Sequence, residues 1–326
     1  MLQRILVSAA IAFVLAAGIG YLLLPFLRAL KAGQSVRDIG PTWHNNKAGT
    51  PLMFGLMFIS ATAICLLCNI PFMKDYSVFY VLLVGVSFGA IGFMDDYYKV
   101  KKKRDMGLTA AQKAMLQAAV AALFVYAMYK NGSMRCDLYI PFFNVTFMIH
   151  PMIYIVFAMF VMVGCVNAVN LTDGVDGLSS SVTIPVMVFF AAVALALDKP
   201  DLALLPACLV GALLAYLLYN WHPAKAFMGD TGSLFLGGVV CALAFALDMP
   251  LVLLLCGFVY VMETVSDIIQ VAYFRATHGK RFFKMAPIHH HFEMCGWKEE
   301  KIVLTFASVS AIMCLLAWFS VSGRIG

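Results

Sequence analysis

The chain has 326 residues, of which 63% are hydrophobic and only 12% charged, and its formal net charge is +6. A mean hydropathy of +0.89 excludes a soluble globular protein, because too little polar surface is present to cover a domain of this size. No polar block is long enough to fold separately. We therefore expect residues 1–326 to form a single all-α, polytopic integral membrane domain.

Ten apolar segments have about the length that a helix needs to cross a bilayer. In chain order they are residues 5–27, 51–70, 77–94, 110–129, 152–169, 179–197, 202–220, 232–247, 251–275 and 302–322. Most of the nine cysteines fall inside these segments, which favours small buried hydrophobes over metal ligands or disulfides. The sequence thus predicts ten transmembrane helices.

The distribution of basic residues predicts how these helices are oriented. Of the 23 Lys and Arg residues, 16 fall in one alternate set of loops, 6 fall in the other set, and Lys113 lies inside a segment. Because cytoplasmic loops carry the excess of Lys and Arg, the first set is expected to be cytoplasmic and both termini to face outward. The only long outward loop contains residues 136–149, which read as a small β-hairpin.

The first cytoplasmic loop contains His44, Lys47 and Gly49-Thr50-Pro51. A basic turn next to the membrane can simply hold anionic lipid head groups. The loop therefore remains open to both a structural and a functional interpretation.

Adjacent carboxylates, Asp95 and Asp96, end the third segment and are followed by Lys99 and a basic run at 101–104. Two neighbouring carboxylates repel each other, unless they share a proton or a divalent cation such as Mg²⁺. The basic run could attract phosphates, although the rule for cytoplasmic loops explains it equally well. Lys113 lies just inside the next segment, where it either pairs with an acid or extends its ammonium to the interface.

The stretch NAVNLTDGVDGL at 167–178 places two amides and two carboxylates behind a long apolar run. Its Asp-Gly-Val-Asp-Gly turn can direct Asp173, Asp176 and backbone N–H groups into one small volume. A polar turn between two helices is the plainer interpretation. The other acidic clusters on the same side favour a site.

The loop at 220–233 reads NWHPAKAFMGDTGS. Glycines on both sides of Asp230-Thr231 allow close approach of a ligand, and Asp230 is a further hard oxygen ligand at the start of a helix. Phe227 is a candidate stacking surface for a base, or else an anchor in the membrane interface.

The last two polar features lie at 263–293. Glu263, Asp267 and Gln270 fall on one face of a helix, and acids at that depth are the best support for an ion-coupled transporter. The run His289-His290-His291 is internal, so it is no affinity tag. A zinc site is disfavoured, because adjacent side chains seldom converge on one ion.

Together these motifs resemble the phospho-N-acetylmuramoyl-pentapeptide transferases of bacterial cell-wall synthesis, in the polyprenyl-phosphate N-acetylhexosamine-1-phosphate transferase superfamily. The resemblance covers nearly the whole chain. It rests on Asp95-Asp96-x-x-Lys99, on NAVNLTDGVDGL, on Asn220 to Ser233, and on MAPIHHHFE at 285–293. The last motif distinguishes this family from relatives that use N-acetylglucosamine phosphate.

The resemblance implies ten transmembrane helices, usually in a homodimer, in the bacterial plasma membrane with a cytoplasmic active site. The implied reaction transfers phospho-MurNAc-pentapeptide from UDP to undecaprenyl phosphate, giving lipid I and UMP, with Mg²⁺ required. It implies membrane lipid and the family's nucleoside inhibitors as further partners, and no nucleic acid. A UDP-N-acetylglucosamine transferase and an ion-coupled transporter remain the alternatives.

The resemblance also implies roles for individual residues. Asp95, Asp96, Asp230 and Lys113 would be catalytic, with Asp230 as the Mg²⁺ ligand. The substrate-binding set would be Lys47, Lys99, Asn170, Asp173, Asp176, Asn220, Phe227, Gln270, His289, His290 and His291. Which of Asp95 and Asp96 acts as a base, and whether transfer takes one step or two, is left open.

Two positions depart from the family pattern. The usual Gly-Thr-Pro-Thr-Met-Gly-Gly reads Gly49-Thr-Pro-Leu52-Met-Phe54-Gly55 here, so the second threonine hydroxyl is lost. Asp267 replaces the usual aliphatic residue.

Overall fold

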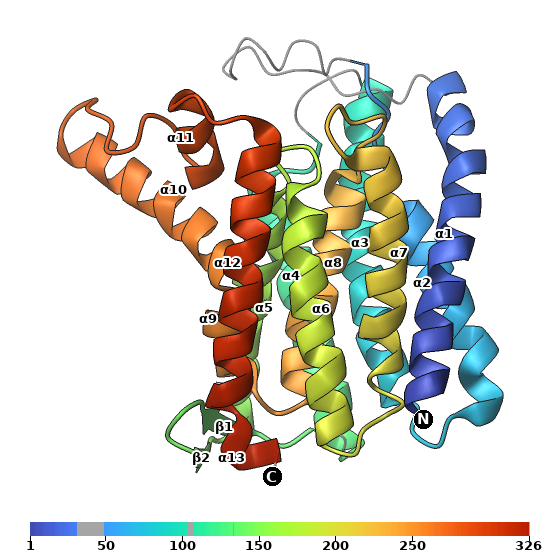
Figure 1. Ribbon diagram of the computed structural model, residues 1–326. Helices are drawn as coiled ribbons and strands as arrows, with labels where there is room; N and C mark the ends of the chain where they lie inside the picture. Colours follow the sequence, from blue (N-terminus) through green and yellow to red (C-terminus); the bar gives the residue numbers. More distant parts are fainter. Residues whose placement is uncertain (31–48, 103–106, 133, 326) are drawn as a thin grey trace.

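The computed structural model describes residues 1–30, 49–102, 107–132 and 134–325 as a helical bundle with one small sheet (Figure 1). The long helices are α1 (Leu2–Ala29), α2 (Leu56–Asn69), α3 (Ser77–Lys102), α4 (Ala110–Lys130), α5 (Pro151–Thr172), α6 (Leu178–Ala196), α7 (Leu204–Asn220), α8 (Gly229–Ala246), α10 (Phe258–Ala276) and α12 (Glu299–Ser320). Shorter elements are η2 (Ile70–Phe72), η3 (Pro250–Val252), α9 (Leu253–Cys256), α11 (Ile288–Met294), α13 (Ser322–Ile325) and the strands β1 (Asp137–Ile140) and β2 (Val145–Met148).

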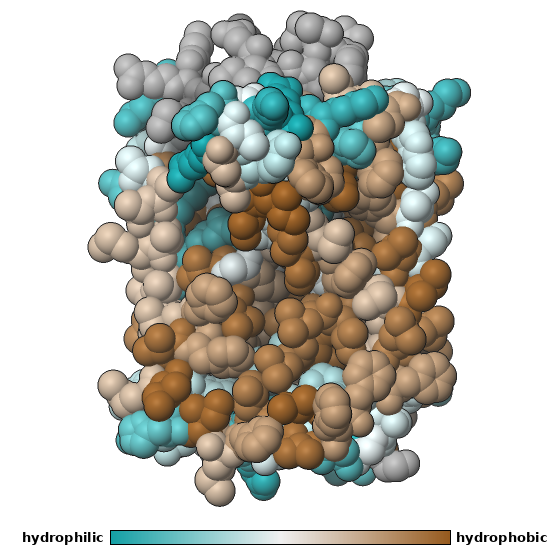
Figure 2. Space-filling view, turned by 90° about the vertical axis from the view of Figure 1, so that its left-hand side faces the viewer, coloured by the Kyte–Doolittle hydropathy of each residue, from teal (hydrophilic) through white to brown (hydrophobic). Residues whose placement is uncertain are grey.

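Among the described residues, seven helices are long and apolar enough to cross a membrane, namely α1, α3, α4, α5, α6, α8 and α12. The bent pair Pro250–Cys256 and Phe258–Ala276 would make an eighth span, and the apolar helices at Leu56–Phe72 and Leu204–Asn220 are shorter. Apolar residues dominate the middle of the face in Figure 2, with hydrophilic residues toward its ends. The chain is therefore a multi-pass membrane protein, since a helix satisfies its own backbone groups in lipid.

Every predicted apolar segment contains a helix, but two segments differ from the expected single span. In the segment at 51–70 the helix begins only at Leu56. The segment at 251–275 is broken at Gly257 and bent by 82°. A β-carbon at Gly257 would lie 2.6 Å from the carbonyl oxygen of Leu253, so a larger residue would not fit this bend. As a result α10 leans away from the bundle, and α11 lies between α10 and α12 (Figure 1).

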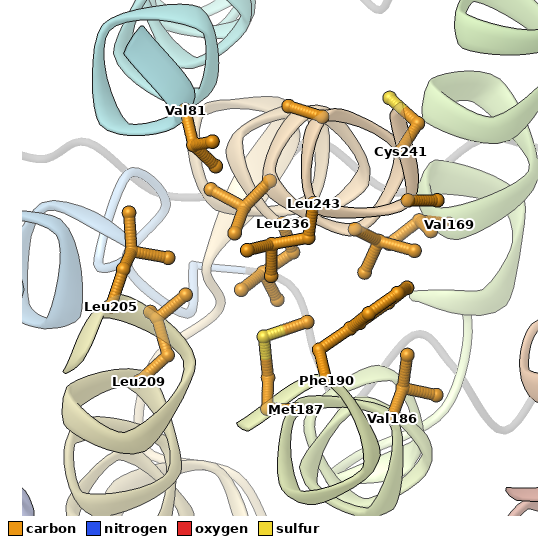
Figure 3. Packing of buried hydrophobic residues seen from close by; sticks show 14 of the residues in the cluster. Val81, Val169, Val186, Met187, Phe190, Leu205, Leu209, Leu236, Cys241 and Leu243 are labelled. Atoms are coloured by element: carbon orange, nitrogen blue, oxygen red, sulfur yellow. The ribbon is translucent and has the colours of Figure 1, made fainter. Parts of the chain in front are cut away.

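Helix α8 forms the centre of the bundle and is buried at every residue from Thr231 to Ala246. Helix α8 packs against α3, α5 and α6, and its side chains Leu236 and Leu243 lie among apolar side chains that include Val169, Met187 and Phe190 (Figure 3). Because α8 is apolar on all sides and enclosed, its first turn is held in a fixed position. That turn carries Asp230.

The predicted hairpin at 136–149 is confirmed as the antiparallel pair β1–β2, with Asp137 opposite Met148 and Ile140 opposite Val145. Its turn contains Phe142 and Asn144 with positive φ, and the Phe142 N–H donates to the carbonyl of Ser320 at 2.8 Å. The sheet and both termini lie at one end of the bundle, whereas α11 lies at the other end (Figure 1).

Candidate active site

The predicted acids of the third segment meet Asp230 where α3 ends and α8 begins. Asp95 and Asp96 are buried near the end of α3, and Asp230 is the second residue of α8. Oxygens of these three carboxylates lie within 4.8 Å of one another. Such a group repels itself unless cations are close, because carboxylates in a poorly hydrated site interact strongly.

Two lysines supply the positive charge. Lys99 Nζ lies 2.6 Å from Asp95 Oδ2 and 3.1 Å from Asp230 Oδ2. Lys113 Nζ lies 3.0 Å and 2.5 Å from the same two oxygens. Both lysine side chains are about one-fifth exposed, so they face an opening rather than the interior. Lys113 therefore pairs with acids instead of reaching freely to the interface.

The position of Lys113 follows from the start of α4. Thr109 accepts the Gln112 N–H at 3.2 Å, and the Gln112 side chain accepts the Thr109 N–H at 3.0 Å. This reciprocal arrangement is a capping box, which fixes the first turn of a helix. Lys113 lies in that turn and therefore faces the acids at the end of α3.

Asp96 has a different role from Asp95, because it caps α8. Its oxygens accept the N–H groups of Asp230 at 3.2 Å and Thr231 at 2.9 Å, and the Thr231 hydroxyl at 2.7 Å. A carboxylate at the N-terminus of a helix satisfies N–H groups that have no partner within the helix, and its charge complements the helix dipole. Asp96 thus fixes the backbone that carries Asp230.

Two glycines make this junction possible. A β-carbon at Gly92 would lie 2.0 Å from the carbonyl oxygen of Asp230, so α3 and α8 could not approach this closely. Gly229 has φ +67°, and its β-carbon would lie 2.4 Å from Asp96 Oδ2. The Gly229-Asp230 pair therefore serves the approach of two helices in addition to any ligand.

Asn170, near the end of α5, joins the same cluster. Its amide nitrogen donates to Asp230 Oδ1 at 3.0 Å and lies 2.7 Å from Ser233 Oγ. Asn167 lies one turn earlier and donates to Gln117 at 2.8 Å, which ties α5 to α4. Of the two amides, Asn170 is the one that contacts the carboxylate cluster.

The turn at 173–177 lies beside this cluster. Asp173 is half-buried, and burial together with the charges of Asp230, Asp96 and Asp176 raises its pKa well above the usual range. Gly177 has φ +79°, and its N–H donates to Asn220 Oδ1 at 2.9 Å. The Asn220 amide donates to the Ala226 carbonyl at 2.9 Å. Asn220 thus connects the two predicted loops through both ends of its side chain.

Asp176 belongs to a second group that the sequence did not reveal. Its Oδ2 accepts the Ala224 N–H at 3.0 Å and lies 3.0 Å from His222 Nδ1. Glu299, at the start of α12, lies 3.5 Å from the same nitrogen and accepts the Asp176 N–H at 3.2 Å. Asp176, His222 and Glu299 therefore form a second set of possible metal ligands.

Phe227 is half-buried, and its backbone pairs with the segment that precedes α2. Its N–H donates to Pro51 at 2.8 Å, and its carbonyl accepts the Phe54 N–H at 3.0 Å. The Phe54 ring packs 5.2 Å from Tyr219 and 6.1 Å from Tyr216. The departure at position 54 is thus a buried aromatic residue that supports the Phe227 loop. Lys47 and His44 lie outside the described residues.

The three consecutive histidines face three different partners. His289 pairs with Glu263 at 3.0 Å, and His290 pairs with Glu293 at 2.5 Å. His291 Nδ1 accepts the Lys284 N–H at 3.1 Å. The candidate metal-ligand groups found among the described residues do not include these histidines.

Gln270 fixes the backbone of the segment that precedes these histidines. Its Oε1 accepts the N–H groups of Phe282 at 3.1 Å and Phe283 at 2.9 Å. Asp267, one turn earlier on α10, is half-buried, and no contact among the described residues explains the aspartate at this position.

Sequence reasoning missed His222, Glu293 and Glu299 as members of the site. His222 and Glu293 lie within predicted motifs, although neither was named as a site residue. Glu299 lies beyond the histidine run, where no local pattern indicates its partner.

Comparisons with known proteins found both a matching family and similar full-length sequences. A family model described as glycosyl transferase family 4 matches residues 78–248, which include Asp95, Asp96 and Asp230. The chain is 45% identical over 317 residues to the phospho-N-acetylmuramoyl-pentapeptide-transferase of Clostridium acetobutylicum, covering 97% of this chain and 98% of the relative. Proteins of the same name from Clostridium perfringens and Bacillus cytotoxicus are 45% and 44% identical, with at least 96% of either chain covered.

Proposed function

From the premise that the chain belongs to the phospho-N-acetylmuramoyl-pentapeptide transferases, within glycosyl transferase family 4, we infer the reaction and how its site performs it. The protein transfers phospho-MurNAc-pentapeptide from UDP-MurNAc-pentapeptide to undecaprenyl phosphate, giving lipid I and UMP. The relatives' name favours this reaction over use of UDP-N-acetylglucosamine. A transporter is disfavoured because Glu263 pairs with a buried histidine.

The observation that carries the proposal is the alternation of charges between Asp95, Lys99, Lys113 and Asp230. In phosphoryl transfer, catalysis consists mostly of holding the phosphates and neutralising the charge that develops on the leaving group. Two partly exposed ammonium groups beside buried carboxylates suit that task. They also suit the approach of a second, lipid-linked phosphate.

We propose Mg²⁺ as the cofactor. The donor set fits this ion, since three carboxylates against two ammonium groups leave a net negative charge and only hard oxygen ligands. Asp230 would hold the ion, because its side chain is about 15% exposed whereas those of Asp95 and Asp96 are almost fully buried. When bound, Mg²⁺ would neutralise charge on the diphosphate.

The contacts suggest how the adjacent acids divide their work. Asp96 already accepts three hydrogen bonds from the start of α8, so its role is to position Asp230. Asp95 Oδ2 faces Lys99 and Lys113, the two groups that would bind incoming phosphate. We therefore assign to Asp95 the role of accepting a proton from the attacking lipid phosphate.

The nucleotide sugar would occupy the space between the 173–177 turn, the Phe227 loop and the histidine run. Phe227 would stack on uracil, and His290 would contact the sugar or phosphate. Asn170, with one end on Asp230, would orient the diphosphate beside the ion. The remaining members of this proposed binding set are Lys47, Lys99, Asp173, Asp176, Asn220, Gln270, His289 and His291.

For the arrangement in the membrane we propose ten spans, with both termini outward and the carboxylate cluster at the cytoplasmic face. Support comes from the bundle itself, in which the termini and the hairpin share the end opposite α11 (Figure 1). A prenyl chain could then stay in lipid while its phosphate reaches the lysines. A homodimer in the bacterial plasma membrane, and binding of nucleoside inhibitors at the uridine site, complete the proposal.

The test uses the purified, full-length protein in detergent. UMP release should require UDP-MurNAc-pentapeptide, a polyprenyl phosphate and Mg²⁺ together, and should stop when any one is omitted. Release of UMP from UDP-N-acetylglucosamine at the same rate would favour the alternative transferase. Ion-driven uptake into vesicles without UMP would favour the transporter.

A further inference from the structure

Glu263 and His289 form a buried pair that the reaction scheme above leaves unexplained. Glu263 lies in the second turn of α10, and its Oε2 is 3.0 Å from Nδ1 of His289 on α11. Their side chains are 0% and 1% exposed. A carboxylate and an imidazole are rarely buried this completely unless they satisfy each other.

The pair differs from the contacts of the neighbouring histidines. His290 meets Glu293 on its own helix, and His291 accepts a backbone N–H from Lys284. His289 instead reaches across 26 residues to another helix. Glu263 therefore fixes the ring of His289 relative to α10, whereas its neighbours are held locally.

The hydrogen bond determines which ring nitrogen carries the proton. An ionised carboxylate can only accept, so the Nδ1 facing Glu263 bears the hydrogen. In neutral His289 the other nitrogen, Nε2, is then an acceptor.

The acceptor nitrogen faces the 173–177 turn. A β-carbon at Gly174 would lie 2.3 Å from Nε2, so only glycine leaves room for the ring at this point. Nε2 is buried and has no hydrogen-bond partner among the described residues. A buried acceptor without a donor is costly, which indicates that a donor reaches Nε2 during the working cycle.

We propose that Glu263 is a positioning residue for the transfer reaction, holding His289 so that Nε2 presents an acceptor to the substrate side of the 173–177 turn. The donor is an O–H or N–H group of the bound nucleotide sugar. This inference rests on the proposed placement of the histidine run at the substrate site.

The first test is the charge-removing variant Glu263→Gln, which keeps the shape of the side chain. Loss of the partner that orients a metal-ligating histidine typically costs about 10- to 100-fold in activity, and we expect a comparable loss for this substrate-facing histidine. We expect kcat to fall by that factor while KM for the nucleotide sugar and the thermal midpoint change little. The control is Asp267→Asn, which removes one charge a single turn further along α10 and should keep wild-type kcat. Wild-type kcat in Glu263→Gln would overturn the proposal.

The second test measures which nitrogen of the His289 ring carries the proton, and it does not depend on turnover. Nitrogen NMR of protein labelled at histidine, with His289→Ala to identify the signal, should show His289 protonated at Nδ1 and unprotonated at Nε2. In Glu263→Gln this preference should weaken, whereas in Asp267→Asn it should persist. The opposite tautomer in the wild type would refute the proposal even if the transferase assay succeeds. The expected tautomer without any UMP release would instead count against the proposed function.

Discussion

Lys113, in the first turn of α4, places its Nζ 2.5 Å from Oδ2 of Asp230 at the start of α8, and 3.0 Å from Oδ2 of Asp95 on α3. Helices α3, α4 and α8 therefore meet at one ammonium group. This group is shared by two acids, so it is poised to exchange a carboxylate partner for a phosphate oxygen.

Replacing Lys113 by Ala should lower kcat about 100-fold or more, because a preorganised charge that meets the transferring phosphates would be lost. Turnover is measured as UMP release at saturating substrates. Lys130→Ala is the matched control, since Lys130 ends the same helix with its ammonium 5.8 Å from the Tyr126 ring. If Lys113→Ala and Lys130→Ala have comparable kcat values, Lys113 has no role in the reaction.

Asp96→Ala should destabilise the protein as well as inactivate it, because α8 would lose its cap. The loss of an N-terminal cap typically costs about 0.5–2 kcal/mol. Thermal unfolding in detergent should show a lower midpoint for Asp96→Ala, and Asp96→Asn, which keeps one acceptor oxygen, should lie between that variant and the wild type. An unchanged midpoint in Asp96→Ala would show that the cap contributes nothing.

Phe227→Ala should raise KM for UDP-MurNAc-pentapeptide roughly 10- to 100-fold, since a stacked base is worth about 1–3 kcal/mol. The effect on kcat should be smaller, because stacking is equally strong in the ground and transition states. Phe143→Ala, at the exposed tip of the hairpin, is the control. If KM stays unchanged, Phe227 is only an anchor at the membrane interface.

The raised pKa of Asp173 predicts a dependence of stability on pH. In the unfolded chain Asp titrates near pH 3.9, whereas the folded protein holds the proton to higher pH. As pH rises above about 4, the folded state therefore binds more protons than the unfolded state and loses stability. Asp173→Asn removes this contribution, so its thermal midpoint should fall less between pH 4 and pH 7. Parallel curves for the variant and the wild type would contradict the raised pKa.

Much of the fold was predictable from the sequence, because the apolar runs mark its helices and the residues at 136–149 mark its hairpin. The apolar runs correctly placed the helices, and the hairpin at 136–149 was correct. The bend at Gly257 was not predictable, because the apolar pattern continues through it. The late start of α2 was missed for a related reason, since residues 51–55 are apolar but pair with the Phe227 loop.

The site was predictable to the extent that its residues lie in compact motifs. Asp95, Asp96, Asp230 and Lys113 were predicted, and the structure brings them together. The division of labour between the two adjacent acids was not predictable, because it depends on which oxygen faces the start of α8. The partners Glu263 and Glu299 were missed as such, since each meets its histidine only through the fold.

The central claim is that Asp230, beside the buried carboxylates of Asp95 and Asp96, holds the divalent ion. The most direct measurement is electron paramagnetic resonance of Mn²⁺, used in place of Mg²⁺, titrated into the purified protein. We predict a binding site that is lost in Asp230→Asn and retained in Glu299→Gln, which alters the second candidate group at Asp176 and His222. Binding that survives Asp230→Asn but disappears in Glu299→Gln would contradict the account and move the metal to that second group.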